Sequence, residues 1–478
     1  MNTIIDFFRE SVENFPDKIA VIFEDREISY RQLDNSINLL SHSLTHLEKG
    51  SIVSIYLENS IDFVISYLGI LNAGMIAHLI PTNLMKEKIQ KQLEISQSKL
   101  VITSKIFIDK INSISYDCEK IVFVESNYRK NQQNKLMKIN NENAYLIFTS
   151  GTTAEPKGVI ITQSNTIFTT KNIVNVLKYN ESDVNILPLP LSHSFGLGCL
   201  HTSLFVGSTL VLIKNATNTI KILKEIEKYN ATTFAAVPLT LNKILKEDEN
   251  CLNYFRNLRL IITNSTSIPI KTVENYRDIL KNGFLATYYG LTEASRSTFM
   301  IFDKLGRETS VGKPYNGIMI KIQNESSNEL EIGQILIKGN NVIKNYWNNL
   351  EADKKIVDTW LLTGDLGHKD SEGYLYLDGR VDYVINIAGE KVIPEDIEIV
   401  VKVLTDVEDA VAIGIKNEMY GEIIKVFVKK SSNSEITKLE ILSQCIKNLE
   451  PHKVPREIEF VDDFPRNEFG KIQRFKLK

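Results

Sequence analysis

The chain reads Thr149-Ser150-Gly151-Thr152-Thr153-Ala154-Glu155-Pro156-Lys157-Gly158 directly after an apolar run at residues 144–148, and this segment says most about its architecture. It gathers hydroxyls, glycines and a lysine in one short loop after a predicted strand. Such a loop turns backbone N–H groups and hydroxyls toward phosphate oxygens, and Lys157 adds positive charge. The segment lacks the Gly-Lys-Ser/Thr ending of a Walker A loop. A Thr/Ser/Gly-rich segment is also an ordinary turn, so its own residues leave both interpretations open.

Short apolar runs alternate with longer amphipathic segments on both sides of this loop. Residues 218–229 place apolar side chains at helical spacing, and further apolar runs lie at 52–57, 100–103, 120–124, 209–213 and 258–263. This alternation predicts an α/β fold with mostly parallel strands buried on both faces. After residue 312 the stretches become shorter, and residues 367–376 are typical of a hairpin.

A domain boundary is predicted at about residues 379–382. The tripeptide Asp378-Gly379-Arg380 is turn-prone, and a new pattern follows it, with a helix over 394–404 and strands over 410–415 and 425–428. We therefore expect a large body over residues 1–381 and a small α+β domain over 383–478.

The composition excludes several classes of protein. The 478 residues are 43% hydrophobic and 24% charged, which is typical of globular domains and excludes disordered, collagen-like and disulfide-rich small folds. Lys and Arg number 56 against 59 Asp and Glu, for a net charge of -3. No excess of basic residues therefore indicates a nucleic acid or an anionic membrane as partner.

Several features predict a cytoplasmic protein. The N-terminal segment carries acidic residues where a signal peptide needs a basic region. Residues 63–85 and 186–213 are uncharged, but their glycines, prolines and polar side chains indicate buried segments and no membrane span. No zinc spacing or C-x-x-C pair occurs among the cysteines, which are Cys118, Cys199, Cys251 and Cys445.

The loop at 149–158 resembles the phosphate loop T-S-G-T-T-G-x-P-K-G of the adenylate-forming superfamily, with Ala154 in place of one glycine. This superfamily includes acyl-CoA synthetases, stand-alone and peptide-synthetase adenylation domains, and beetle luciferases. Further resemblances occur before and after this loop, in the same order as in the family, at residues 28–33, 71–74, 188–196, 288–293, 360–365, 379–382 and 465–474. The resemblance implies a large multi-layer body of αβ sheets with a small β subdomain, and a small mobile C-terminal domain.

The resemblance also implies an ATP site. The residues expected to bind ATP are Thr149, Ser150, Gly151, Thr152, Thr153, Lys157, Tyr289, Gly290, Thr292, Asp365, Arg380 and Lys471. Thr292 would donate to the α-phosphate, and Asp365 with Arg380 would fix the ribose hydroxyls. The alternatives without a role in ATP binding are a helix-capping role for Thr292 and an ion pair between loops for Asp365 and Arg380.

The same resemblance implies that the catalytic residues are Lys471, Thr292, Glu293 and His193. Lys471 would bridge the substrate carboxylate and the α-phosphate, and Glu293 would hold Mg²⁺, since a hard ion favours an oxygen ligand. A solvated tail lysine and a glutamate at a helix N-terminus are the alternatives. Asp382 would be a hinge about which the small domain rotates between a pose presenting Lys471 and a thiol-transfer pose presenting the loop at Gly389.

The expected acyl pocket comprises His193, Ser194, Asn264, Ser265, Thr266 and Gly290. Amino-acid-activating relatives carry an aspartate where this chain has the uncharged Ser194, which argues against an α-amino acid. Asn264-Ser265-Thr266 replaces smaller residues, so we expect a short, aromatic or polar acid and no long fatty acid.

Four motifs favour coenzyme A as the thiol acceptor: the Gly-Thr-Thr of the loop, Tyr-Gly-Leu-Thr-Glu at 289–293, residues 389–394 and residues 452–455. The alternative acceptor is the phosphopantetheine of a carrier protein, loaded by a stand-alone adenylation enzyme. A protein of this fold without catalysis and a luciferase-like activity remain as other classes.

Overall fold

The computed structural model describes residues 2–122, 141–150, 156–247, 254–264, 268–303, 306–324, 326, 328–387, 390–417, 421–432, 434–466 and 472–477. The chain forms two compact units. The first unit comprises Met1–Ile320 and Ile337–Leu361, and the second comprises Lys321–Leu336 and Leu362–Lys478. The sequence predicts a separate boundary at residues 379–382, about which the C-terminal domain would rotate, and this boundary stays a prediction.

The larger sheet of the first unit has the strand order β2-β1-β10-β9-β11-β12-β13-β14-β15. Its strands from β1 to β13 along this order pair in parallel, whereas β2, β14 and β15 are antiparallel to their neighbours. The bounds are β1 Ile19–Phe23, β2 Arg26–Ser29, β9 Val184–Leu187, β10 Thr209–Leu212, β11 Thr233–Ala235, β12 Leu260–Thr263, β13 Phe284–Leu291, β14 Ala294–Ile301 and β15 Ser310–Pro314.

The second sheet of this unit has the order β6-β5-β3-β4-β7-β8. All its pairs are parallel except β7 with β8, and every residue of β3, β4 and β5 is buried, as expected for strands covered on both faces. The bounds are β3 Ile52–Tyr56, β4 Ile76–Leu79, β5 Leu100–Thr103, β6 Glu119–Val122, β7 Asn143–Ser150 and β8 Pro156–Thr162. The predicted α/β class with mostly parallel strands is confirmed.

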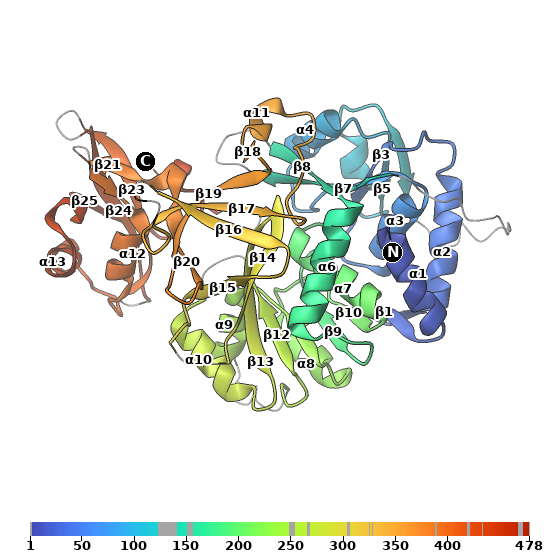
Figure 1. Ribbon diagram of the computed structural model, residues 1–478, viewed down its shortest axis with the longest axis horizontal. Coiled ribbons are helices and arrows are strands. Elements are labelled where there is room, and N and C mark those ends of the chain that lie inside the picture. The colour runs from blue at the N-terminus through green and yellow to red at the C-terminus, as the bar shows by residue number, and fades with distance from the viewer. Residues whose placement is uncertain are drawn as a thin grey trace. The chain divides into compact units, whose positions relative to one another are not determined.

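Helices connect and cover these strands, and α6 and α7 lie side by side (Figure 1). The two uncharged stretches hold α3 and α7, which explains their composition, because both helices are buried around almost their whole circumference. Across the described ranges, no helix is both long and apolar enough to cross a membrane. The helices are α1 Ile4–Asn14, α2 Tyr30–Ser43, α3 Ile61–Asn72, α4 Lys86–Ser96, α5 Ile108–Asn112, α6 Gln163–Leu177, α7 Ser194–Val206, α8 Thr219–Lys228, α9 Pro238–Glu247, α10 Ile270–Ile279 and α11 Leu350–Asp353.

The second unit begins with strands of one sheet and continues into a small α+β layer. The chain passes between the units within β16, β17 and β19. The later sheet has the order β22-β21-β24-β23, with β25 on β24, and it packs on α12 and α13 through an apolar core. The bounds are β16 Ile318–Gln323, β17 Gly333–Gly339, β18 Ile356–Val357, β19 Trp360–Lys369, β20 Leu375–Arg380, β21 Ile385–Ile387, β22 Glu390–Val392, α12 Pro394–Lys402, β23 Val407–Asn417, β24 Gly421–Lys430, α13 Lys438–Asn448 and β25 Glu457–Phe460.

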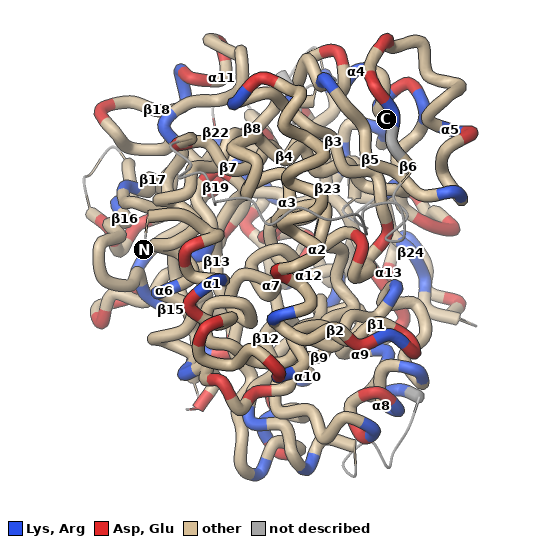
Figure 2. The backbone as a smooth tube through the Cα atoms, turned by 90° about the vertical axis from the view of Figure 1, so that its right-hand side faces the viewer, with Lys and Arg blue, Asp and Glu red and all other residues tan. Residues whose placement is uncertain are grey.

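Two local predictions for this half of the chain are confirmed. The hairpin expected at 367–376 is the β19–β20 turn, in which Gly373 N donates to Asp370 O at 2.9 Å with Gly373 at a φ of +83°. The helix expected from residue 394 is α12, which starts on Pro394. Figure 2 shows basic and acidic positions interspersed along the chain, as the near-equal totals predict.

Candidate active site

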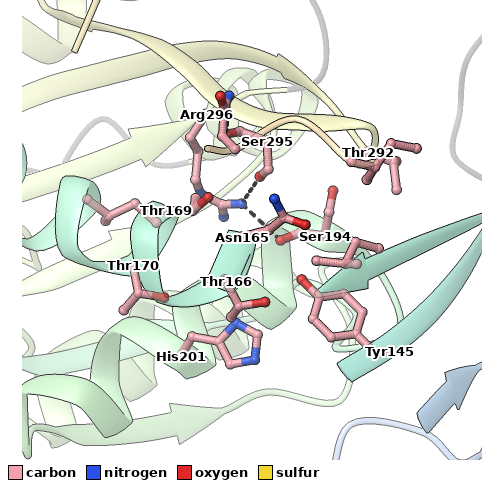
Figure 3. Close-up of a pocket in the computed structure, with 15 residues that line it drawn as sticks. Tyr145, Asn165, Thr166, Thr169, Thr170, Ser194, His201, Thr292, Ser295 and Arg296 are labelled. Atoms are coloured by element: carbon pink, nitrogen blue, oxygen red, sulfur yellow. Dashed lines mark hydrogen bonds between the residues drawn. The ribbon is translucent and has the colours of Figure 1, made fainter. Parts of the chain in front are cut away.

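A pocket in the first unit is lined mainly by hydroxyl and amide side chains (Figure 3). They come from β7, α6, α7, the turn before β14, β14 itself and the segment at residue 341. The pocket contains Ser194 and Thr292, so it joins two parts of the expected site that lie far apart in the sequence. Its lining residues are Tyr145, Ile161, Asn165, Thr166, Thr169, Thr170, Ile173, Ser194, Gly198, His201, Thr292, Ser295, Arg296, Asn341 and Ile343.

Helix α6 supplies the polar wall of the pocket. Asn165, Thr166, Thr169, Thr170 and Ile173 recur at a spacing that places them on one helix face. The Asn165 Nδ2 group also donates to the carbonyls of residues 340 and 342, at 2.7 and 3.0 Å. The start of α6 therefore holds the chain segment that brings residues 341 and 343 to the pocket.

Helix α7 carries two glycines whose lack of a side chain is required. A Cβ on Gly196 would lie 2.2 Å from Pro190 O, and one on Gly198 would lie 2.3 Å from Arg296 Nη2. The structure shows that Gly198 leaves room for a guanidinium.

Thr292 and Glu293 form the turn between β13 and β14, so the alternative readings of both as helix-terminal residues are wrong. A Cβ on Gly290 would lie 2.5 Å from the backbone nitrogen of Arg296, which explains the glycine of this motif. The Glu293 carboxylate accepts a hydrogen bond from Tyr346 Oη at 3.0 Å. The turn thus holds Thr292 at the pocket and orients one carboxylate.

Arg296 is the only ionised side chain among the described residues that line the pocket, and it is 3% exposed. Its Nη1 donates to Ser194 O at 3.1 Å and Ser295 Oγ at 2.7 Å, and its Nη2 donates to Phe195 O at 3.1 Å. The guanidinium carbon lies 4.8 Å from the ring centroid of Tyr288. In the described part of the chain, no Asp or Glu pairs with it.

The backbone of Arg296 is strained. Its φ of +54° lies in the left-handed region, which costs a residue other than glycine on the order of 1 kcal/mol or more. This strain occurs in a bulge where Ser295, Arg296 and Ser297 lie opposite Gly290.

His201 lies in the same pocket and is uncharged near neutral pH. Burial lowers its pKa to about 3, and the charge of Arg296 acts in the same direction. Its Nε2 lies 2.8 Å from Tyr67 Oη. The pocket therefore holds one net positive charge, on Arg296.

The two ends of the predicted phosphate loop lie on the antiparallel strands β7 and β8. Thr149 lies opposite Lys157 and Ser150 lies opposite Pro156 in antiparallel register. The residues between them, Gly151, Thr152, Thr153, Ala154 and Glu155, lie outside the described residues.

In the second unit, Asp365 on β19 and Arg380 on β20 are cross-strand neighbours and form an ion pair. The pair anticipated as a loop contact thus connects two strands. Arg380 Nη2 also lies 3.5 Å from Asp382 Oδ2, in a short 3-10 helix at Val381–Tyr383. Their roles in ribose binding and hinge motion stay predictions.

The remaining expected residues are placed as follows. His193 precedes α7 as its N-cap residue, Tyr289 is on β13, and Asn264 follows β12, where it forms a hydrogen bond with Tyr288. Ser265, Thr266, Gly389 and Lys471 lie outside the described residues.

Sequence reasoning missed Arg296, His201, Tyr346 and the wall formed by α6. One signal was available, since Arg296 interrupts a run of small, hydroxyl and apolar residues that predicts a buried strand. The other contacts join segments that are remote in the sequence, so no local pattern marks them.

Comparison with known proteins identifies the family. The family described as AMP-binding enzyme matches residues 8–347, and its C-terminal domain matches residues 396–471. An oxalate–CoA ligase of Arabidopsis thaliana is 30% identical, covering 99% of this chain and 97% of the relative. A 2-succinylbenzoate–CoA ligase of Bacillus pumilus is 30% identical, covering 97% and 95%.

Solved structures agree with this assignment. The o-succinylbenzoate CoA synthetase of Bacillus subtilis in complex with its acyl-adenylate intermediate has a TM-score of 0.88 and 27% identity, covering 99% of this chain and 97% of that one. The same enzyme in complex with ATP and a magnesium ion has a TM-score of 0.86 and 27% identity, covering 98% of both chains. The chain therefore belongs to the AMP-binding enzyme family, and it is an AMP-forming acid–thiol ligase of the adenylate-forming superfamily.

Proposed function

We propose that this chain activates a small polar carboxylic acid with ATP, forming an acyl-adenylate and pyrophosphate, and then transfers the acyl group to coenzyme A. A carboxylate is a poor acyl donor because its leaving group would be oxide. Attack of the carboxylate on the α-phosphate replaces that leaving group with AMP. The attack brings two anions together, so the site must offer cations and hydrogen-bond donors to the developing charge.

The observation that carries the proposal is the shared pocket of Thr292, Ser194 and the α6 hydroxyls. Thr292 is the expected donor to the α-phosphate, so an acid bound in this pocket has its carboxylate beside the reacting phosphate. The wall that contains Thr169 and Thr170 favours a polar acid, because an alkyl chain would offer their hydroxyls no hydrogen-bond partner.

The acyl pocket proposed here contains His193, Ser194, Asn264, Ser265, Thr266 and Gly290, as the resemblance implies. Gly290 acts through the backbone, since its missing Cβ allows the bulge at Arg296 to form. Ser194 lines the pocket directly.

The ATP site fits the residues that the structure describes. Lys157 and Thr149 face each other at the base of the loop, and Glu293 presents an oxygen ligand held by Tyr346. Magnesium retains waters and phosphate ligands, so one carboxylate suffices, and the described residues contain no cluster of three or more His, Cys, Asp or Glu side chains suited to a metal. When bound, the ion would neutralise phosphate charge.

Two further roles rest on the resemblance. Lys471 is proposed to bridge the carboxylate and the α-phosphate. Asp382 is proposed to be the hinge about which the small domain rotates from this pose to one that presents Gly389 for thiol transfer. Coenzyme A is the proposed acceptor because the matched relatives are CoA ligases. A cytoplasmic location remains part of the proposal.

Pyrophosphate release against a panel of carboxylic acids tests the proposal. Each acid is assayed with ATP and Mg²⁺, and with CoA, a phosphopantetheinylated carrier protein or neither thiol. Release with short polar acids, coupled to acyl-CoA formation, is the expected result. Release with no acid contradicts the activity, palmitate as the sole substrate contradicts the acid class, and transfer only to the carrier protein contradicts CoA as acceptor.

A further inference from the structure

Arg296 is a buried cation for which the described residues supply no counter-ion. Its three hydrogen bonds go to two backbone carbonyls and one hydroxyl. Burying an ionised group without an opposite charge is costly, and proteins compensate for it by pairing. No Asp or Glu is among the described residues that line the pocket.

The guanidinium also has unused donors. Arginine has five N–H groups, and the described residues accept from three of them. Nε is buried and has no hydrogen-bond partner among the residues that the structure describes. Figure 3 shows the guanidinium pointing toward Asn165 and Ser194, among the side chains that line the pocket.

We propose that Arg296 binds a second carboxylate of the substrate, so that the acids activated are short dicarboxylates. The inference rests on the proposed function, since it names the acid that the same pocket accepts. A carboxylate matches the guanidinium in charge and accepts from two of its N–H groups at once. With the first carboxylate near Thr292 and the second at Arg296, both ends of the acid have a donor.

The pocket is built to keep this cation in place. Gly198 provides space for Nη2, the ring of Tyr288 lies against the guanidinium carbon, and the strained bulge aims the side chain inward. A purely structural arginine would tie β14 to α7 through Ser194 O and Phe195 O and would be indifferent to the charge of the substrate. The two roles predict different substrate dependence.

The wild-type test compares acids matched in length and differing at the far end. Succinate is paired with butyrate and with succinamate, whose far end is a neutral amide, and malonate is paired with propionate. The value of kcat/KM for each acid is measured by pyrophosphate release. A dicarboxylate preference of about 10²-fold or more is expected, because a site built around a polar partner rejects analogues that lack it. Equal use of the matched acids overturns the inference but leaves the proposed function intact. Release with none of the acids overturns both.

Variants then assign the preference to the side chain. Arg296→Met is expected to lower the ratio of kcat/KM for succinate over butyrate at least about tenfold, whereas Arg296→Lys keeps the charge and is expected to retain part of the ratio. An equal loss on both acids would show a structural role only and overturn the inference. If Arg296→Met does not fold, as checked by circular dichroism, the wild-type succinate-to-succinamate ratio and the Lys variant decide.

Discussion

An arginine packs against a tyrosine ring in each unit, and these two arginines differ in what balances their charge. The guanidinium carbon of Arg296 lies 4.8 Å from the ring centroid of Tyr288, and that of Arg474 lies 5.1 Å from the centroid of Tyr383. Arg474 forms two contacts with the carboxylate of Glu398, one of them at 3.0 Å. Arg296 has no such partner in the described ranges, although both donate to backbone carbonyls.

The difference separates an arginine that holds a fold together from one that is available to a ligand. Arg474 connects its own segment to α12 through Glu398 and through Glu395, at 3.1 Å. Arg259 likewise pairs with Asp183 in the first unit. Arg474 and Arg259, which connect parts of the fold, each have a carboxylate partner, whereas the described residues offer none to Arg296, which lines the pocket.

The largest effect on stability is expected from Arg474→Met. It would leave Glu398, 6% exposed, as a buried carboxylate without its cation, which costs about 3–5 kcal/mol. Arg296→Met leaves no carboxylate of the described residues without its cation, so its loss of stability should be smaller. Denaturant unfolding, with hydrogen exchange followed in β23 and β24, measures the local effect.

Lys476→Met is the matched control for Arg474→Met, because it removes an exposed cation two residues away. It should leave the protection of β23 and β24 unchanged. A larger loss of stability for Arg296→Met than for Arg474→Met would contradict the distinction drawn between the two arginines.

Lys471→Ala tests whether the second unit also contains a cation that serves the reaction. We expect adenylate formation to slow by about 10²–10³-fold, since one group that stabilises developing charge is lost. Thiol transfer from supplied acyl-adenylate should change far less. Single-turnover measurements of each half-reaction check this, with Lys476→Ala as the control, and an equal loss in both halves would contradict the two-pose account.

Local patterns in the sequence were sufficient for much of the fold. The strand at 144–148, the helix at 218–229 and the turn at 370–373 were predicted because their apolar spacing and turn residues lie within a few positions. The helix at 218–229 even begins at a local cap, since Asn218 accepts from the backbone nitrogen of Lys221 at 2.9 Å.

The pocket could not be predicted in the same way. Gly198 leaves room for Arg296, and Tyr346 donates to Glu293 from 53 positions away in the sequence. The partner that explains each residue therefore lies in a remote segment. The motif at 288–293 located the turn. It gave no indication that the charge three residues after Glu293 would enter the pocket, because that depends on a bulge in the strand pairing.

Gly198→Ala is expected to have an intermediate effect by disturbing Arg296 without removing it. The added Cβ would lie 2.3 Å from Nη2, and overpacking of this kind costs about 1–3 kcal/mol. Combined with Arg296→Met, which removes the clashing group, the loss of stability should fall below the sum of the two single losses. Denaturant unfolding of the wild type, the two single variants and the double variant completes the double-mutant cycle. Additive losses of stability would show that the role of the glycine is not to make room for the arginine.

The smallest expected effect is a loss of folding stability at acid pH, to which two buried histidines contribute. Burial lowers the pKa of His201 and of His78 to about 3 each, below the value of about 6.5 in an unfolded chain. Between these values the unfolded state binds protons that the folded state excludes. Each histidine's contribution is therefore complete above pH 6.5 and is lost as the pH falls toward 3, by about 1 kcal/mol at pH 5.5.

The two histidines sharpen the comparison because only one of them lies near an uncompensated cation. The charge of Arg296 adds to burial in lowering the pKa of His201, whereas the side chain of Gln92 opposes burial and raises the pKa of His78. His201→Gln and His78→Gln should each reduce the loss of stability between pH 7 and pH 5.5, measured by denaturant unfolding. Arg296→Met should raise the pKa of His201 alone, so it should weaken the acid dependence in the wild-type background and have no such effect when His201 is already glutamine. An acid dependence that Arg296→Met changes equally in both backgrounds would mean that the guanidinium does not act on His201, and that the pocket is less isolated from solvent than its buried side chains indicate.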